Sequence, residues 1–333
     1  MRTWKNPARS PLAVGALFFP LASLTACSAE GPDGPAAEPV IPAWEWTEQQ
    51  ILDTVNEVRA GRSLQPESWP GGARVAVLLS FDGDNETISL RYGEPTIGGL
   101  SQGEYGARVA LPRVVELLDR HEIPASFFIP AMSLKINPGQ TEVIAASGRH
   151  EFAVHGWVHE MNTQLTAELE RELVVRALDH LEEVTGSRPI GYRAPSWNFS
   201  PHTLDIIREL GFLYDSSLMS DDRPYELLAA GAPTGIVELP VEWIRDDAPL
   251  LNPLGQRYSA PRDVLQVYID EFDRAHQEGT MFLLTMHPHY IGHRSRLVIL
   301  EELIDHILAR GDAWFATHQQ VAEYVSQQAG LKP

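Results

Sequence analysis

The sequence RVAVLLSFDGDNE, residues 74–86, joins a strongly apolar run to a group of carboxylates. The run itself, residues 74–81, does not alternate apolar and polar side chains, which is typical of a strand buried in a parallel sheet. Asp82, Asp84 and Glu86 follow. Carboxylates at the start of a loop often cap backbone groups or face solvent, so alone they are a weak signal. The segment therefore predicts a buried parallel strand that ends at a polar turn.

Seven further segments are similar to this strand in length and composition. They are ASFFI (125–129), EFAVH (151–155), PIGY (189–192), FLYD (212–215), IVELP (236–240), MFLLTMH (281–287) and AWFA (313–316). Helices are predicted between most of them, for example over residues 107–121 and 166–184, and Ser200-Pro201 is typical of a helix start. This alternation over residues 74–325 predicts an α/β fold with right-handed crossovers, namely a distorted or incomplete (β/α) barrel.

The N-terminal region is predicted to be an export signal. A basic start precedes an apolar run, residues 11–26, that is too short to span a bilayer. The run ends in LTAC, which is similar to a bacterial lipobox, and Cys27 is the only cysteine of the chain. Residues 1–26 are therefore interpreted as a lipoprotein signal peptide. The mature protein would be exported to the bacterial cell envelope and anchored to the membrane only by lipid on Cys27.

Three further segments are predicted downstream. Residues 27–46 are rich in Ala, Pro, Gly and Glu and are interpreted as a flexible tether. Residues 47–73 are expected to hold a helix over 47–59, with Thr47 as its N-cap, and a lead-in. Residues 74–327 are expected to form one catalytic domain. The net charge of −19 makes nucleic acid and anionic lipid unfavourable partners.

Polar residues gather at the ends of four predicted strands. The clusters are FDGDNE (81–86), HGWVHE (155–160), YRAPSW (192–197) and MHPH (286–289). Active-site residues of (β/α) barrels lie at the C-terminal ends of strands, so we expect these side chains to meet. His155 and His159 stand four residues apart, and one carboxylate would complete a set of three metal ligands with open positions. Such a pair is a weak signal alone, but at strand ends beside carboxylates it indicates a metal site.

The segments SFDGDNE, HGWVH, RAPSW and LTMHP, in this order, resemble the motifs of the polysaccharide deacetylase family, also called the NodB-homology or carbohydrate esterase 4 group. Residues 103–130 and 211–225 resemble its peptidoglycan-deacetylase-like and allantoinase-like branch, whose first motif is of D-x-D-x-E type. The resemblance extends over residues 74–325. It implies a distorted (β/α) barrel and a metal-dependent hydrolase that acts on a non-peptide carbon–nitrogen bond.

The resemblance also implies a role for each motif residue. Asp84, His155 and His159 match the ligands of one divalent metal ion, for which zinc is expected, although cobalt, nickel, manganese or iron would also fit. Asp82 matches the catalytic base that takes a proton from water.

The remaining motif positions match the other half of the chemistry. His287 corresponds to the general acid that protonates the departing amine, and Arg193 to the residue that orients the base. An acid of this kind needs a carboxylate partner to stay protonated near neutral pH. Asp215 is the first candidate for that partner, with Asp221 and Asp222 behind it.

Other residues have a functional and a structural interpretation of similar weight. Trp197 and Trp243 would line the substrate pocket, or they are core residues. Glu86 and Glu160 would orient ligands, or they are solvated.

Two departures from the broader family leave the substrate open. Gly83 separates the two aspartates, and Gly156 replaces the usual Ser or Thr after the first histidine. We expect N-deacetylation of an N-acetylated glycan such as peptidoglycan or a chitin-type oligosaccharide. The alternatives are hydrolysis of a small cyclic amide, imide or ureide, iron-dependent oxygenation, which shares the ligand set, and a non-catalytic binding lipoprotein. Relatives in this branch often assemble as homo-oligomers, which is expected here too.

Overall fold

The computed structural model describes residues 41–252 and 258–331. The chain divides into two units, Met1–Trp46 and Thr47–Pro333. In the first unit, the described part contains a short 3-10 helix, η1 (Ala43–Glu45). The predicted signal peptide, the lipidated cysteine and most of the tether lie outside the described residues. No helix within the described residues is long and apolar enough to cross a bilayer.

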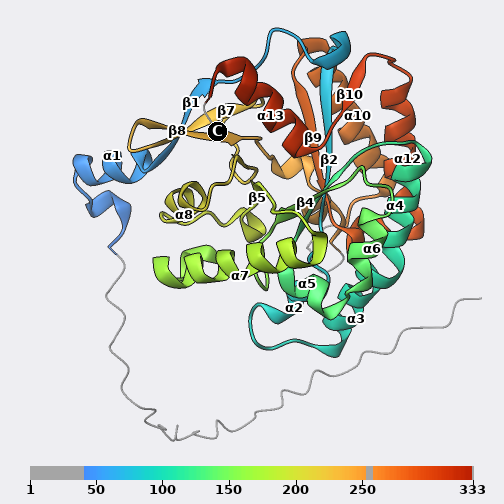
Figure 1. Cartoon of the computed structure of the whole chain (residues 1–333), viewed down its shortest axis with the longest axis horizontal. Coiled ribbons are helices and arrows are strands. Elements are labelled where there is room, and N and C mark those ends of the chain that lie inside the picture. Colours follow the sequence, from blue (N-terminus) through green and yellow to red (C-terminus); the bar gives the residue numbers. More distant parts are fainter. Residues whose placement is uncertain (1–40, 253–257, 332–333) are drawn as a thin grey trace, which may run out of the picture. The chain divides into compact units, whose positions relative to one another are not determined.

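The second unit is built on one ten-stranded sheet, shown in Figure 1. The strands are β1 (Val58–Ser63), β2 (Val75–Asp82), β3 (Ser126–Ile129), β4 (Glu151–Val154), β5 (Gly191–Tyr192), β6 (Tyr214–Asp215), β7 (Tyr225–Ala229), β8 (Ala232–Glu238), β9 (Met281–Met286) and β10 (Ala313–Phe315). Their order is β1-β7-β8-β6-β5-β4-β3-β2-β10, and β9 also pairs with β2. All pairs from β8 to β10 are parallel. The curled sheet confirms the predicted distorted (β/α) barrel, and all eight predicted strands are present.

Helices connect the strands. They are α1 (Glu48–Asn56), α2 (Thr87–Leu90), α3 (Ile97–Tyr105), α4 (Leu111–Arg120), α5 (Ala131–Ile136), α6 (Gly139–Ala145), α7 (Ala167–Thr185), α8 (Thr203–Glu209), α9 (Asp247–Leu251), α10 (Pro261–Glu278), α11 (Pro288–Ile291), α12 (Arg294–Leu308) and α13 (His318–Ala329). Short 3-10 helices are η2 (Pro70–Gly72), η4 (Asn162–Gln164), η5 (Pro195–Trp197) and η6 (Trp243–Arg245), and η3 (Gly106–Ala110) is a π-helical turn. The helix predicted at Ser200-Pro201 begins at Thr203, although the Ser200 hydroxyl still accepts the Thr203 N–H.

The first helix and the strands around it differ from the prediction. Thr47 caps α1 as expected, but the helix ends at Asn56 and β1 follows, whereas a helix to residue 59 was predicted. β1 and β7 were not predicted. β1 pairs antiparallel with β7, and β7 pairs antiparallel with β8. A two-residue turn joins β7 to β8, and its residues Ala230 and Gly231 both have positive φ. Such turns usually carry Asn or Asp first, so this Ala-Gly pair gives a weak hairpin signal.

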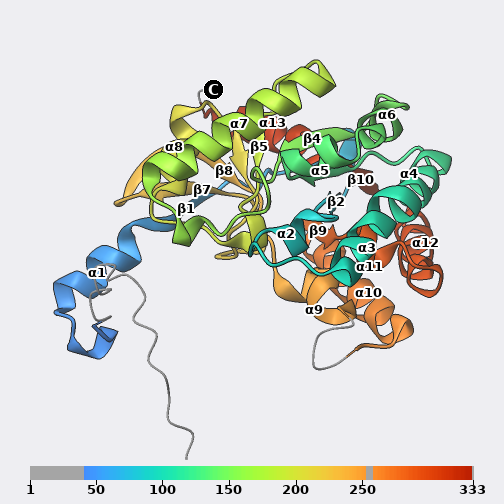
Figure 2. The same cartoon turned by 90° about the horizontal axis from the view of Figure 1, so that it is seen from below.

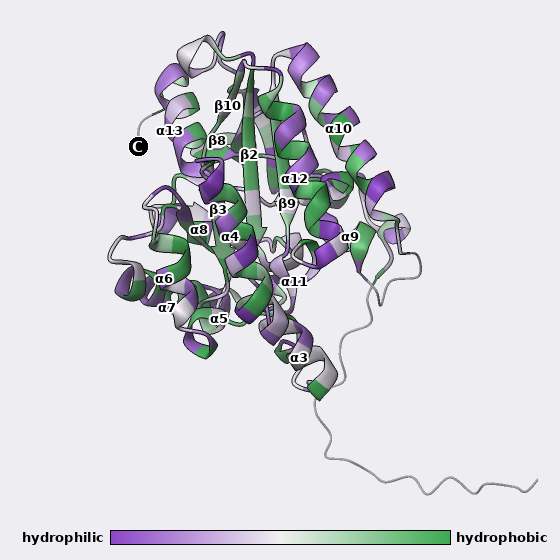
Figure 3. Cartoon of the chain, turned by 90° about the vertical axis from the view of Figure 1, so that its right-hand side faces the viewer, coloured by the Kyte–Doolittle hydropathy of each residue, from purple (hydrophilic) through white to green (hydrophobic). Residues whose placement is uncertain are grey.

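The two faces of β2 show how the core leads to a polar site. Val75, Val77, Leu79 and Phe81 belong to one buried apolar cluster, whereas Ala76 and Leu78 belong to another. In Figure 3, β2 is green through most of its length. Because side chains alternate along a strand, the face of Ala76 and Leu78 continues with Ser80 and Asp82. The interior of the barrel therefore changes from apolar to polar toward the C-terminal end of the strand.

The segment after β8 crosses to the far edge of the sheet. Asp246 forms an isolated parallel bridge with Thr285 of β9, so residues 239–246 run from one side of the open barrel to the other. The segment continues into α9, which contacts α11, and α11 contacts α3. Figure 2 shows α2, α3, α9 and α11 grouped at this end of the sheet. The segment after β8 thus bridges the open barrel at the C-terminal ends of its parallel strands.

Candidate active site

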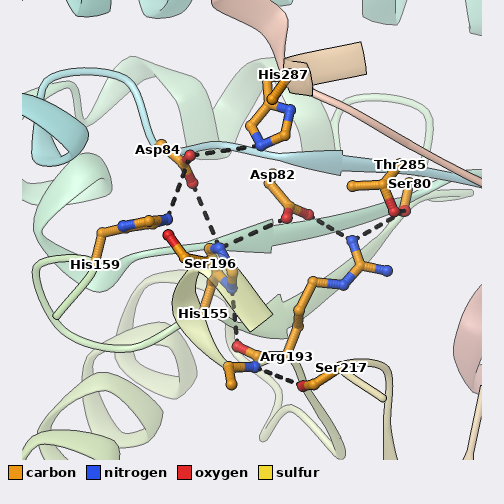
Figure 4. Close-up of polar contacts among 12 residues, drawn as sticks. Ser80, Asp82, Asp84, His155, His159, Arg193, Ser196, Ser217, Thr285 and His287 are labelled. Carbon is orange, nitrogen blue, oxygen red and sulfur yellow. Dashed lines mark hydrogen bonds and ion pairs between the residues drawn. The ribbon is translucent and has the colours of Figure 1, made fainter. Parts of the chain in front are cut away.

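Three buried side chains from two strand ends form a compact cluster, drawn in Figure 4. Asp84 lies two residues beyond β2, His155 follows β4 directly, and His159 lies four residues further on. Nε2 of His155 lies 3.5 Å from Oδ1 of Asp84, and Nε2 of His159 lies 3.4 Å from Oδ2. Each side chain offers one ligand atom, and these atoms all lie within 4.8 Å of one another. The structure therefore brings together the three predicted metal ligands.

His155 and Asp84 present donor atoms that suit a divalent cation. Nδ1 of His155 lies 2.8 Å from the backbone carbonyl of Arg193. A carbonyl only accepts, so Nδ1 carries the ring proton and Nε2 turns its lone pair toward the cluster. Oδ1 of Asp84 is buried and receives no hydrogen bond from the described residues. Because a buried anionic oxygen without a donor is costly unless a cation compensates it, these residues fit a metal ion.

The loop that carries both histidines has an unusual backbone. Gly156 has a φ of 75°, and a Cβ atom there would lie 2.8 Å from Cγ of Pro195. The Glu160 carboxylate accepts the backbone N–H groups of Trp157 and Val158, at 2.7–3.0 Å. Gly156 is therefore required by the turn, which explains the departure from the Ser or Thr of the broader family. Glu160 shapes this loop through its backbone.

Asp82 lies beside the cluster and is paired with Arg193. Nη1 of Arg193 donates a 2.6 Å hydrogen bond to Oδ1 of Asp82, and Oδ2 lies 3.6 Å from Nε2 of His155. Burial would raise the pKa of Asp82, but the charges of Arg193, His155 and His287 outweigh it, so the pKa lies below its ordinary value. Asp82 therefore stays ionised next to the cluster, as a general base must.

The guanidinium of Arg193 is itself fixed in place. It is fully buried, and its Nε and Nη2 donate to the carbonyl and the hydroxyl of Ser216, both at 2.9 Å. Nη1 also donates to Ser80 at 3.1 Å, and the guanidinium carbon lies 3.9 Å from the centre of the Phe128 ring. Arg193 therefore orients Asp82 from a rigid position.

His287 follows β9 and faces the cluster from the other side. Its Nε2 lies 3.7 Å from Oδ2 of Asp84, and its Nδ1 lies 2.7 Å from Oδ1 of Asp247 and 3.5 Å from Oδ1 of Asp246. Burial lowers the pKa of His287, but the two neighbouring carboxylates outweigh burial and raise the pKa well above its ordinary value. The imidazole is therefore protonated near neutral pH and presents Nε2–H to the cluster, which suits a general acid.

The prediction that Asp215 supports His287 is wrong. Asp215 accepts the N–H of Ser217 at 3.0 Å and its hydroxyl at 2.8 Å, and that hydroxyl accepts the N–H of Ala194. Asp215 thus supports the turn after Arg193. The physical reason is the strand order, because β6 and β9 lie on opposite sides of β2 in the sheet.

The alternatives to Asp215 do not contact His287 either. Asp221 accepts the backbone N–H of Arg223, and Asp222 lies 3.6 Å from Arg245. Sequence reasoning missed the actual partners, Asp246 and Asp247. Their signal was an acidic pair before Ala248, and Asp246 does cap α9 by accepting the Ala248 N–H. Only the crossing of this segment to β9 reveals the second role.

The remaining predicted site residues, Trp197, Trp243 and Glu86, are not part of the cluster of three predicted metal ligands. Trp197 is 8% exposed and packs on Trp243, which is 46% exposed, with ring centroids 4.1 Å apart. Glu86 is buried, and it accepts a hydrogen bond from Asn137 at 2.9 Å. Trp197 thus belongs mainly to the core, Trp243 reaches the surface, and Glu86 anchors the start of α2.

A curled α/β barrel whose strand ends bring together an ionised carboxylate, a protonated imidazole and a cluster that could hold a metal ion has the arrangement of a barrel enzyme. The family model for polysaccharide deacetylase matches residues 103–214. A crystal structure from Mycobacterium smegmatis, named for a polysaccharide deacetylase, is 36% identical, covers 83% of this chain and 97% of its own, and has a TM-score of 0.75. The chain belongs to the polysaccharide deacetylase family.

Two further relatives are named for different substrates, one for peptidoglycan and one for allantoin. The peptidoglycan deacetylase of Helicobacter pylori is 29% identical over 260 residues, which are 69% of this chain and 88% of that protein. The crystal structure of the Puue allantoinase is 26% identical, covers 78% of this chain and 92% of its own, and has a TM-score of 0.69.

Proposed function

We propose that the protein is a metal-dependent N-deacetylase of an N-acetylated glycan. One observation carries this proposal: a carboxylate held ionised by Arg193 and an imidazole held protonated by Asp247 face the same three-ligand cluster. Hydrolysis of an amide needs a base for water and an acid for the departing amine, and both are available at neutral pH.

The chain's own residues account for the proton transfers. Asp82 takes a proton from water as the water oxygen attacks the acetyl carbon. Nε2–H of His287 then protonates the nitrogen, the carbon–nitrogen bond breaks, and acetate and a free amine remain. A divalent cation held by Asp84, His155 and His159 would polarise the carbonyl and acidify the water.

Zinc is the proposed metal, because two imidazoles and one carboxylate with open positions form a common catalytic zinc site. Cobalt, nickel, manganese and iron accept the same donors, so metal analysis of protein purified without added metal is the direct test.

A glycan is favoured over a small cyclic amide by the location predicted for the chain. Export and lipid anchoring at Cys27, both of which remain proposals, would place the site among cell-envelope glycans. The exposed Trp243 beside the site offers a face on which a sugar ring packs. Assembly into a homo-oligomer also remains a proposal.

The test compares N-acetylglucosamine oligomers and peptidoglycan with allantoin and succinimide, using zinc-loaded protein that begins after Cys27. Acetate release from the glycans that is lost in Asp82→Asn supports the proposal. Turnover of only the cyclic compounds would keep the site chemistry and replace the substrate. Metal binding without turnover of any compound would contradict the proposal.

A further inference from the structure

Ser196 occupies a strained position next to the cluster. It lies in η5 with φ 53° and ψ 23°, and Trp197 after it also has a φ of 53°. Residues other than glycine rarely adopt this left-handed conformation, and they keep it only where the surroundings enforce it. Such strain often accompanies a side chain that must point in a particular direction.

The hydroxyl of Ser196 points toward the metal-binding cluster. Figure 4 shows its oxygen on the side of His155 and His159. The residue is partly exposed, whereas both histidines are buried.

Arg91 holds and polarises this hydroxyl. Arg91 follows α2, and its Nη1 donates a 2.7 Å hydrogen bond to Oγ of Ser196. The same Nη1 lies 3.1 Å from Nδ1 of His159, and the guanidinium packs on the ring of Tyr92. A guanidinium only donates, so the Ser196 oxygen accepts and keeps its own proton to donate. Among the residues that the structure describes, no acceptor for that proton lies within hydrogen-bond distance.

We propose that Ser196 is a further catalytic residue, whose hydroxyl donates a hydrogen bond to the acetyl oxygen as negative charge develops on it. This inference rests on the proposed deacetylation. When water adds to the acetyl carbon, the carbonyl electron pair moves to the oxygen, and Ser196 O–H stabilises that charge without losing its proton. The hydrogen bond weakens again when the carbon–nitrogen bond breaks and the carbonyl re-forms. Arg91 is a positioning residue that aims the hydroxyl.

The competing explanation is that Ser196 only anchors Arg91 or shapes the turn. Ser196→Ala removes the hydroxyl and keeps the strain, whereas Ser196→Gly removes both, so this pair separates the hydroxyl from the shape of the turn. Arg91→Met leaves the hydroxyl in place and should cost less kcat than Ser196→Ala, whereas equal losses would mean that Ser196 only anchors Arg91. If the hydroxyl is catalytic, kcat falls by about 10- to 100-fold in both Ser196 variants. In other enzymes, removal of one hydrogen-bond donor to the oxyanion lowers kcat by about 10²- to 10³-fold. KM and zinc content stay near wild type. Ser295→Ala, an exposed serine on α12, is the matched control and keeps full activity.

A second readout does not depend on turnover. The carboxylate oxygens of acetate resemble the acetyl oxygen on which negative charge develops during the reaction. Binding of acetate to the zinc-loaded protein can be followed by the fluorescence of Trp197, the residue after Ser196. We expect both Ser196 variants to bind acetate about tenfold more weakly, as expected for one lost hydrogen bond to an anion. Wild-type kcat and acetate affinity in Ser196→Gly would overturn the role of Ser196 and leave the deacetylase proposal intact. If wild-type protein deacetylates no glycan, the acetate titration still decides the role of this hydroxyl.

Discussion

Two buried carboxylates lie at opposite ends of the parallel strands, and their surroundings differ. Glu151, at the start of β4, accepts hydrogen bonds from the hydroxyls of Ser126 and Tyr214, at 2.7 and 2.6 Å, and from the N–H of Gln319 at 2.9 Å. Asp84, beyond the end of β2, has one buried oxygen that receives no hydrogen bond within the described part of the chain. Both side chains are more than nine-tenths buried.

The difference separates a carboxylate that the fold satisfies from one whose buried oxygen has no donor among the described residues. Burial raises the pKa of Glu151 and of Asp84 alike, so burial by itself does not distinguish them. Glu151 is satisfied by neutral donors from β3, β6 and the start of α13, and it thereby holds these elements together. Asp84 instead faces the Nε2 atoms of three histidines. A buried carboxylate oxygen that the fold leaves without a donor points to a ligand that supplies the missing interaction.

The largest expected effect comes from Asp84→Asn. The variant should lose stoichiometric zinc and lower the rate of acetate release by at least about 10³-fold, because metal-assisted chemistry needs all ligands. Its unfolding temperature in the presence of a chelator should change little, because Oδ1 of Asp84 receives no hydrogen bond from the described residues that the substitution could remove. Zinc analysis, acetate assays and thermal unfolding check this. Full zinc content in the variant would contradict the assignment of Asp84 as a ligand.

The next effect concerns Asp247→Asn. Asp247 helps to raise the pKa of His287, so His287 should lose its proton at a lower pH in the variant. The alkaline limb of the pH–rate profile should therefore move to lower pH, and kcat at neutral pH should fall by about 10²-fold or more. Asp222→Asn is the matched control, because Asp222 is exposed and lies on another loop. An unchanged alkaline limb would show that Asp247 does not control the acid.

Glu151→Ala should reverse the pattern seen for Asp84. Three donors lose their acceptor, so the free energy of unfolding should fall by about 1–3 kcal/mol or more. The kcat of the folded fraction should remain near wild type, because Glu151 does not contact the cluster. Denaturant unfolding and zinc-loaded kinetics measure both quantities. A large loss of kcat with unchanged stability would mean that Glu151, like Asp84, contributes to catalysis and not mainly to stability.

The smallest expected effect comes from Trp243, a partly exposed side chain. Trp243→Ala removes a ring that is 46% exposed and packs on Trp197. KM for glycan oligomers should rise about two- to tenfold, as expected for one aromatic contact, while kcat changes little. Steady-state kinetics with oligomers of two lengths test this. An unchanged KM would limit Trp243 to a structural role.

Much of the site follows from local sequence. The apolar runs and their polar ends predict where Asp82, Asp84, His155 and His287 lie, because parallel strands bring their C-terminal ends to one edge. Gly156 could be noted but not explained, since only the structure shows that its φ is positive and that Pro195 fills the space of a side chain.

The sequence alone thus determined the class of fold, the order of its parallel strands along the chain and the residue types at each strand end. These depend on hydrophobic period and on turn chemistry, which act over a few residues. The tertiary structure decided which carboxylate supports His287, which buried carboxylate oxygen is left without a donor, and that Arg91 meets Ser196. Along the chain, Asp215 ends one predicted strand and Asp247 lies seven residues beyond another, so Asp215 looks the better candidate. Only the crossing from β8 to β9 puts Asp247 beside His287, because pairing between distant segments depends on how the whole sheet curls.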